Sequence, residues 1–271
     1  MRHYRRSLAA VAGLFASLLL VPTANAGVGD LLVAPTRVIL NGGRGTEIIL
    51  KNVGDATATY RVSAEFRRMT PEGKLVAVTD PNGDEKAAEE MVIFAPRKVT
   101  LPPNEPQSIR VSARAPAGLA DGEYRIHLLF RAIPDPKPVD KPAEASTVAF
   151  QLIPIYGVTI PVIVRLGKVE AKAAIANVRH IAGKGGEEVS LTLSRNGNRS
   201  LFGEIRVMKA GVKTPVAIAK GIAVYREIDS RTVVVPKAAD YSGSLSGPVT
   251  VQFYETTDSG AVLSAETSAV L

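Results

Sequence analysis

Few residues of this chain could do chemistry, and their spacing matches no common catalytic or metal-binding pattern. Apart from His3, the histidines are His127 and His180, and no cluster of carboxylates accompanies either of them in the sequence. A zinc site needs three or four nitrogen, sulfur or oxygen ligands, usually at short spacing. Cysteine is absent, so thiolate metal ligands and cysteine nucleophiles are excluded. We therefore predict no catalytic residue, no metal site and no cofactor.

Two short motifs have a plainer interpretation than chemistry. Gly183-Lys184-Gly185-Gly186 lacks the spacing and the Lys-Ser/Thr pair of a phosphate-binding loop, and it predicts a flexible hairpin. Asn198-Arg199-Ser200 fits a glycosylation sequon, but these residue types are also typical of turns. No Gly-x-Ser-x-Gly elbow occurs, so a secreted hydrolase on a β scaffold is only a third hypothesis. The chain is predicted not to be an enzyme and to bind no small-molecule substrate.

The most informative segment is the uncharged run of 18 residues from Thr147 to Val164. Its two prolines, its glycine and its many β-branched residues favour a strand over a transmembrane helix of similar length. Pro154 and Pro161 cannot donate ladder hydrogen bonds, so the strand is expected at a sheet edge. A long apolar edge strand promotes aggregation unless a partner pairs with it, as in β-augmentation. The alternative is an interior strand that runs into an interdomain linker.

The residues that such a strand would donate depend on its register, because alternate side chains point to opposite faces. One register presents Phe150, Leu152, Tyr156, Val158 and Ile160. The other register presents Ile153, Ile155, Gly157 and Ile163. We prefer the first set, because its side chains are larger and form a more continuous row.

The first 26 residues contain the three parts of a secretory signal. Three arginines within the first six residues precede an apolar stretch from Leu8 to Val21. Ala24-Asn25-Ala26 then fits a small-x-small cleavage site. Residues 1–26 are therefore predicted to be a signal peptide that is cleaved on export, and an uncleaved N-terminal anchor is the alternative.

Strand-like runs dominate the rest of the chain. They are rich in Val, Ile, Thr, Tyr and Phe, and turn residues such as Asn41-Gly42-Gly43 separate them. Many short strands at this spacing indicate sandwiches rather than a parallel α/β sheet. The pattern breaks near Leu166-Gly167-Lys168 and then starts again. We predict an all-β protein with two immunoglobulin-like β-sandwich domains in tandem, residues 27–165 and 166–271.

Two local features are predicted within these domains. Asn196-Gly197 lies between two strand candidates, which is a strong short-range signal for a hairpin. The segment from Glu85 to Met91 has a weak helical pattern.

The charge of the chain and its lack of cysteine limit the possible partners and the source of its stability. The formal net charge is +7, but no dense run of Lys and Arg occurs, so nucleic acid is not a predicted partner. A chain without disulfides must be stabilised by a hydrophobic core, and a chain of this length can build one.

Five segments in sequence order resemble the PapD-like pilus chaperones, and together they cover nearly all of the first predicted domain. The segments are Leu32–Leu40 with Arg37, Leu50–Asn52 with the turn that follows, Phe94–Val111 with its prolines, Gly122–Pro134, and the long apolar strand. Each segment is short, and the resemblance depends on their order.

The resemblance implies a periplasmic chaperone that caps pilin-like subunits by donor-strand complementation and delivers them to an outer-membrane usher, in fimbrium biogenesis and cell wall organization. It implies that Arg37 holds the terminal carboxylate of the subunit, a task suited to a planar guanidinium that can donate two parallel hydrogen bonds. It also implies an interdomain salt bridge that includes Glu123 and Arg165. No aspartate of the second domain is a clear third member, and Asp240 lies only near the expected position.

One departure from the family and one rival hypothesis stay open. The family often has a second anchor, a lysine in the donated strand, but Pro161 stands at the aligned position and no lysine occurs between Thr147 and Val164. Either Arg37 acts alone, another cation substitutes, or the chain is a divergent member. The rival hypothesis is an exported two-domain adhesion or surface structural protein whose long strand belongs to its own core.

Overall fold

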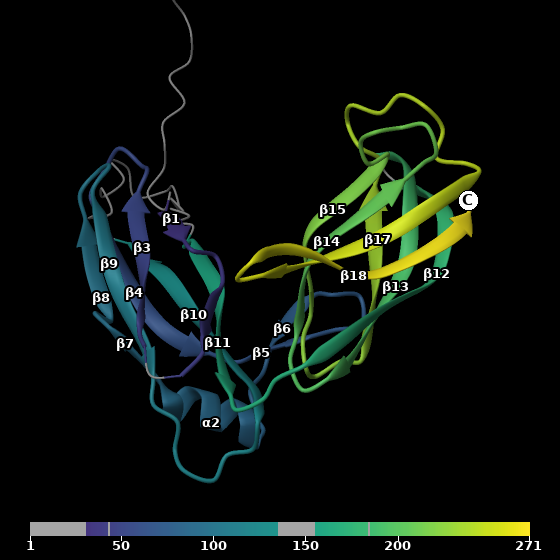
Figure 1. The fold of residues 1–271 in the computed structure, drawn as a ribbon. Coiled ribbons are helices and arrows are strands. Elements are labelled where there is room, and N and C mark those ends of the chain that lie inside the picture. Colours follow the sequence, from purple (N-terminus) through teal and green to yellow (C-terminus); the bar gives the residue numbers. More distant parts are fainter. Residues whose placement is uncertain (1–30, 43, 135–154, 184) are drawn as a thin grey trace, which may run out of the picture.

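The computed structural model describes residues 31–42, 44–134, 155–183 and 185–271. These residues form strands almost throughout, arranged as two β-sandwiches that follow one another along the chain (Figure 1). The predicted fold class, an all-β protein with two immunoglobulin-like sandwiches in tandem, is confirmed. The predicted signal segment lies outside the described residues.

The first sandwich packs a four-stranded sheet against a five-stranded sheet. The four-stranded sheet has the order β1 (Leu31–Ala34), β3 (Thr46–Asn52), β9 (Pro106–Ala113) and β7 (Val92–Ala95). The five-stranded sheet has the order β2 (Val38–Leu40), β11 (Gly157–Leu166), β10 (Gly122–Ile133), β4 (Ala58–Glu65) and β8 (Lys98–Leu101). In the five-stranded sheet, β11 pairs with β10 in the antiparallel sense and with β2 in the parallel sense.

The second sandwich is built from the strands that follow. One sheet has the order β12 (Ala171–Gly183), β13 (Gly186–Gly197) and β16 (Ser230–Pro236). The other has the order β15 (Ala217–Val224), β14 (Leu201–Met208), β17 (Pro248–Thr257) and β18 (Gly260–Val270). A separate hairpin from the first half of the chain, β5 (Arg67–Met69) with β6 (Leu75–Ala77), extends to the second sandwich (Figure 1). It is held there by a hydrogen bond of 2.8 Å from the amide of Thr232 to the carbonyl of Pro71.

Each sandwich has its own hydrophobic core, because alternate residues of its strands point inward. Leu128 and Phe130 of β10 are fully buried in the first core, and Phe253 of β17 is fully buried in the second. A third and smaller buried cluster combines residues of both halves of the chain: Met69, Ile163, Ala223 and Tyr225. This third cluster joins the two sandwiches through apolar contact.

The opening strand that the sequence suggested between Leu32 and Leu40 is divided in two. β1 pairs with β3 in one sheet, whereas β2 pairs with β11 in the other. Pro35 stands at the break, and a proline cannot continue a ladder because it has no amide hydrogen. The chain therefore crosses between the two sheets at residues 35–37, and Arg37 is the last residue of this crossing.

The weak helical pattern in the first domain is confirmed as α2 (Gly83–Met91). Asn82 caps its N-terminus, and Asn82 and Glu85 form a reciprocal capping box. Ala88 and Met91 are buried on its inner side. Within the described ranges, no helix is long and apolar enough to cross a membrane.

The predicted hairpin at Asn196-Gly197 is wrong, because β13 and β14 belong to different sheets. A Cβ atom at Gly197 would lie 2.2 Å from the carbonyl oxygen of Glu170, and the φ of Gly197 is +135°. The glycine is therefore explained by close backbone approach and not by a two-residue turn. The glycine-rich segment after β12 does form a hairpin as predicted, since Gly183 pairs with Gly186.

Asn52 at the end of β3 closes the turn that follows it. Its side-chain amide donates to the carbonyls of Ala56 and Leu101 at 2.7 and 2.9 Å, and its Oδ1 accepts from the amide of Gly54 at 3.0 Å. Asn52 is buried, so these three backbone groups have little access to water. The asparagine is thus a structural residue of the first sandwich.

We predict that Asn52→Ala lowers the free energy of unfolding by about 2–4 kcal/mol, because buried polar groups left unpaired cost about 1–3 kcal/mol each. Urea unfolding followed by circular dichroism measures this change. Asn41→Ala, which removes an exposed side chain, is the control and should change stability by less than about 0.5 kcal/mol. Equal effects of the two variants would contradict this role of Asn52.

Candidate functional site

The two edges of β11 are used differently. One edge pairs with β10 along the whole strand, from Gly157 opposite Arg131 to Leu166 opposite Gly122. The other edge pairs with β2 only from Val162 to Val164. From Gly157 to Pro161, the second edge therefore has no paired strand among the described residues. We call this stretch the open edge of β11.

Arg37 lies where the open edge ends, immediately before the first residue of β2. Its side chain extends to the second sandwich, where Nη2 donates a hydrogen bond of 2.9 Å to Oγ of Ser200. Nη1 donates a longer bond of 3.5 Å to the hydroxyl of Tyr225. The guanidinium carbon also lies 4.8 Å from the centroid of the Phe202 ring, within the range of a cation–π interaction.

The charge of Arg37 is only weakly compensated. Among the residues that the structure describes, its hydrogen-bond partners are hydroxyl groups, and its Nε has no hydrogen-bond partner. Burial lowers the pKa of the Arg37 guanidinium, although Tyr225 and Glu123 act in the opposite direction. Such a group is well suited to receive a carboxylate, which would supply both the missing charge and hydrogen-bond acceptors.

The predicted donor residues are placed differently from one another. Phe150 and Leu152 lie outside the described residues. Tyr156 is 56% exposed, just before β11 begins. Val158 packs partly against the first core, and Ile160 is fully buried inside it. Ile160 therefore belongs to the core of its own sandwich, and its assignment to the donated face is wrong, because the even-numbered residues of β11 point inward.

The opposite face is the exposed one where β11 begins. Ile155 is 47% exposed, and Gly157 is exposed as well. Ile163 belongs to the same alternate set, but it is buried in the third cluster against the second sandwich. Both sets are thus exposed before β11 begins, and they separate within the strand, where Ile160 is buried while Thr159 and Pro161 of the other set stay partly exposed.

Glu123 and Arg165 face each other across β10 and β11. The Nε of Arg165 lies 3.2 Å from Oε2 of Glu123, whose side chain is almost completely buried. The backbone of Glu123 is also bonded to the second sandwich, since its amide donates to the carbonyl of Asn198 and its carbonyl accepts from Arg226. The second sandwich therefore contacts this pair through Asn198 and Arg226 and not through an aspartate.

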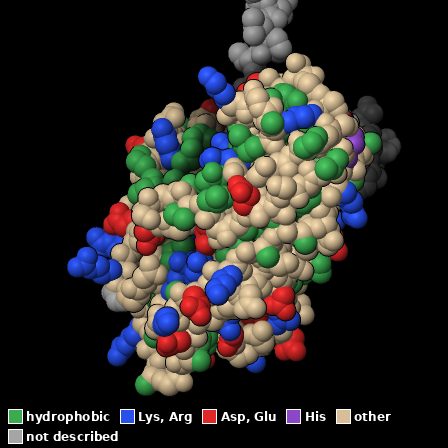
Figure 2. All heavy atoms as spheres, turned by 45° about the vertical axis from the view of Figure 1, so that its right-hand side comes forward, with side chains coloured by type: hydrophobic (Ala, Val, Ile, Leu, Met, Phe, Trp, Pro, Cys, Tyr) green, Lys and Arg blue, Asp and Glu red, His purple; other side chains and the backbone are tan. Residues whose placement is uncertain are grey.

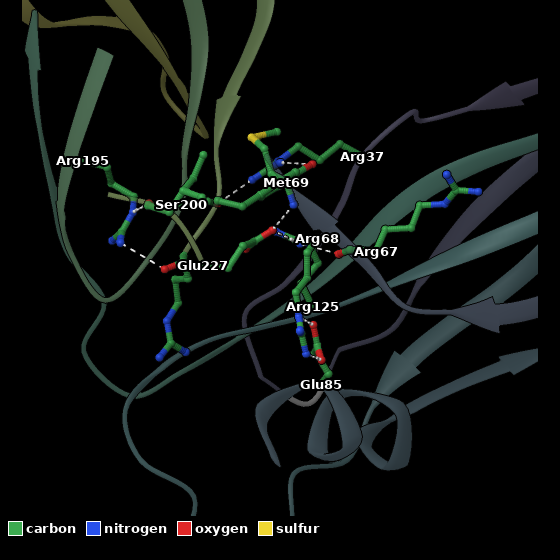
Figure 3. Close-up of polar contacts among 12 residues, drawn as sticks. Arg37, Arg67, Arg68, Met69, Glu85, Arg125, Arg195, Ser200 and Glu227 are labelled. Carbon is green, nitrogen blue, oxygen red and sulfur yellow. Dashed lines mark hydrogen bonds and ion pairs between the residues drawn. The ribbon is translucent and has the colours of Figure 1, made fainter. Parts of the chain in front are cut away.

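A further contact between the sandwiches was not predicted from the sequence. Arg125 stacks on the ring of Tyr225, with 3.6 Å between the guanidinium carbon and the centroid. It also pairs with Glu227 at 2.6 Å (Figure 3). Glu227 also accepts a bond of 2.7 Å from the amide of Met69 in the β5–β6 hairpin. These residues fix the second sandwich beside Arg37. Their separation of about a hundred positions left no local signal that could have revealed them.

His127 is buried on the same face of β10 as Arg125. Neither ring nitrogen has a hydrogen-bond partner in the described part of the chain. Burial, together with the positive charges of Arg125, Arg67 and Arg37, lowers the pKa of His127 to about 3. The ring is thus neutral near pH 7 and acts as a packing group, 6.4 Å from the centroid of Tyr225.

The pKa of His127 predicts a loss of stability in acid. The unfolded chain binds a proton near pH 6.5, whereas the folded chain binds it only near 3, so stability falls as the pH drops between these values. The slope is at most about 1.4 kcal/mol per pH unit. His127→Leu should flatten this dependence, measured as the urea midpoint from pH 7 to pH 4.

His180→Leu is the matched control for this measurement. His180 lies 3.2 Å from Glu187 and its side chain is partly exposed, so its removal should leave the acid slope that we assign to His127. An unchanged slope in His127→Leu would mean that other groups cause the acid sensitivity.

No protein-family model and no curated protein sequence matches the chain. Solved structures do show a similar fold. The chain is 16% identical to the E. coli chaperone DraB, with a TM-score of 0.47, over 91% of this chain and 98% of that one. It is 16% identical to the YadV chaperone, with a TM-score of 0.46, over 89% of this chain and 100% of that one.

A third similar structure is a complex. It contains the Salmonella enterica SafA pilin with the SafB chaperone, and the match has 14% identity and a TM-score of 0.46 over 90% of this chain and 98% of the matched one. At these identities and scores the likeness concerns the fold, and the function has to be inferred from the residues themselves.

Proposed function

We propose that this chain is an exported chaperone that binds a pilin-like subunit by pairing the open edge of β11, and the segment before it, with the subunit's sheet. The observation that supports this most is the coincidence of the open edge with Arg37. The edge ends at Val162, where β2 takes over the pairing, and Arg37 immediately precedes β2. A strand added to the open edge would lie in line with β2, which pairs with the same edge of β11 further along.

The direction of the added strand follows from the position of Arg37. β2 runs parallel to β11, and its first residue lies opposite Val162. A subunit strand that also ran parallel to β11 would end near Val162, with its C-terminus toward Arg37. Its terminal carboxylate could then bind the guanidinium in a charge-assisted pair, replacing the weaker hydroxyl contacts. In this proposal, Arg37 is the carboxylate anchor.

Arg37 does not need a lysine in the donated strand to create a positive potential. Arg165 and Arg125 both lower the pKa of Arg37, as nearby positive charges do. Each is paired with an acid, Glu123 or Glu227, so together they form an ordered charge network rather than free cations. We propose that this network takes the place of the second anchor that the resemblance would put at Pro161.

The outward face of the donating segment carries the apolar side chains in this proposal. Ile155 is the exposed apolar residue nearest the start of β11 on that face. Phe150 and Leu152 remain predictions of the sequence. Export through cleavage of residues 1–26, a periplasmic location and delivery of the subunit to an outer-membrane usher complete the proposal, and they follow from the resemblance.

The proposal predicts that Arg37→Ala weakens capture of the subunit about 10- to 100-fold, the equivalent of a charge-assisted hydrogen bond of about 1.5–3 kcal/mol. The assay is periplasmic co-expression with a pilin-like subunit encoded beside this chain, followed by one-to-one co-purification. Arg37→Lys keeps the charge but not the planar fork, and it should capture at an intermediate level.

Arg44→Ala removes an exposed arginine elsewhere and is the control for this experiment. It should capture as the wild type does. The thermal melt of Arg37→Ala should stay within a few degrees of the wild type, so that lost capture is not lost folding. If Arg37→Ala captures normally, the anchor assignment is rejected, and if the wild type captures nothing, the adhesion or surface protein becomes the better hypothesis.

A second variant tests the donated face. Ile155→Asp would put a charge where an apolar side chain is to enter the subunit. Because burying an unpaired charge is costly, capture should fall by more than about tenfold. Ile93→Asp on β7 is the matched control, because Ile93 is also an exposed isoleucine, at 54% against 47% for Ile155. Normal capture by Ile155→Asp would reject this face.

A further inference from the structure

Three basic side chains form a straight row across neighbouring strands of the first sandwich. Arg131 of β10 lies directly opposite Arg61 of β4, and Arg61 lies directly opposite Lys98 of β8. Opposite residues of antiparallel strands point to the same face, so the three side chains project together. All three are exposed. We call this set the cationic row.

The cationic row has no compensating acid in the described part of the chain. No ion pair or side-chain hydrogen bond joins Lys98, Arg61 or Arg131 to a described residue. Other basic side chains on the sheets do have such partners, as Arg67 has Glu65 at 2.6 Å and Arg110 has Glu47 at 3.6 Å. Like charges directly opposite each other destabilise a sheet. A row of three is therefore unfavourable for the free sandwich unless an anion binds to it.

An apolar groove of about 440 Å³ adjoins the row. Its lining combines two members of the row, Arg61 and Arg131, with polar Ser63 and with apolar side chains: Leu129, Ala132, Ile133, Pro134 and Ile155. Ile155 is also the outward residue of the donating segment. A ligand that filled the groove would thus present apolar groups to its floor and negative charge to its cationic border.

The row lies on the same face as the junction that contains Arg37. Arg125, His127, Leu129 and Arg131 are alternate residues of β10 and therefore share one face. Arg125 is at the end that contacts the second sandwich, and Arg131 is about 20 Å further along, since each residue of a strand advances about 3.3 Å. The open edge lies on the other side of β11 from β10, so a partner contacts the row only where it also covers this face of the sheet.

We propose that the cationic row is a specificity site for acidic side chains of the partner, on a strand of the pilin-like subunit in which apolar and acidic residues alternate. This inference rests on the proposed function, because that function puts a foreign strand next to Ile155. In such a strand the acidic residues all point to one face, so they can meet the cations of the row together, while the apolar residues point into the subunit.

A protein strand fits these observations better than a membrane or a nucleic acid. Binding to nucleic acid is supported by many phosphate contacts over a broad basic surface. The face shown in Figure 2 instead has Asp and Glu side chains among its Lys and Arg side chains. The row is one residue wide, and Ser63 and the Thr59–Thr100 hydroxyl pair flank it on the neighbouring positions of the strands.

The test uses two labelled peptides of about twelve residues, twice the length of a typical strand. One alternates Val with Glu, and the other alternates Val with Gln. Fluorescence anisotropy with the mature chain should give about tenfold tighter binding for the Glu peptide, because each exposed ion pair adds only a factor of a few. The triple variant Arg61→Gln, Lys98→Gln, Arg131→Gln should bind both peptides equally, and 0.5 M salt should reduce the preference in the wild type.

The matched control removes three exposed cations that lie outside the row: Arg44→Gln, Arg114→Gln, Lys220→Gln. It has the same net charge as the first triple variant, and it should keep the tenfold preference. Equal loss of preference in both triple variants would show a general charge effect and overturn the proposal. Equal binding of the two peptides by the wild type would overturn it as well.

Two further measurements complete the test: binding to lipid vesicles and capture of the subunit. If the wild type binds phosphatidylglycerol vesicles through the row and shows no preference for the Glu peptide, the row is a lipid site and the proposal fails. Subunit capture separates this proposal from the function on which it rests. Capture that depends on Arg37 but tolerates the row variant keeps the chaperone and rejects the row, whereas loss of capture in both variants supports the row.

Discussion

The structure depends above all on the unequal pairing of β11. A strand in the middle of a sheet normally satisfies the backbone groups on both of its edges, and β11 does so only from Val162 to Val164. From Gly157 to Pro161, one edge is bonded to β10 and the other has no described strand beside it. The buried face of β11 is fixed by the first core, and this fixes which side chains face outward. The strand is thus held firmly in place while half of one edge, from Gly157 to Pro161, remains available for pairing.

The second sandwich supplies the residues that surround Arg37 at the end of the open edge. Arg37 belongs to the first sandwich, but its contacts with Ser200, Tyr225 and Phe202 all come from the second. Arg125, Glu227 and the β5–β6 hairpin hold those residues in position. A guanidinium between hydroxyl groups, near other arginines, keeps much of its charge uncompensated. Both sandwiches therefore contribute residues to the site that we propose.

Much of the fold and part of the candidate site could be predicted from the sequence, and the wrong predictions have physical causes. The fold class, α2 and the pair Glu123–Arg165 depend on alternation, capping or an aligned motif, which are visible locally or by resemblance. The preferred register failed because the size of Tyr156 and Val158 says nothing about which face meets the core, and a shift of one residue exchanges the faces. The break of the first strand was signalled by Pro35 but not recognised. The surroundings of Arg37 come from residues more than 160 positions away, so no local pattern could reveal them.

Amide hydrogen exchange across β11, with and without a bound pilin-like subunit, tests the central claim most directly. In the free chain, the amides between Gly157 and Ile160 that do not bond to β10 should exchange quickly, whereas Val164 should be protected by its place between two strands. The account predicts strong protection of the first group when the subunit binds, with little change at Val164. A stable complex in which exchange from Gly157 to Ile160 stays as fast as in the free chain would contradict it.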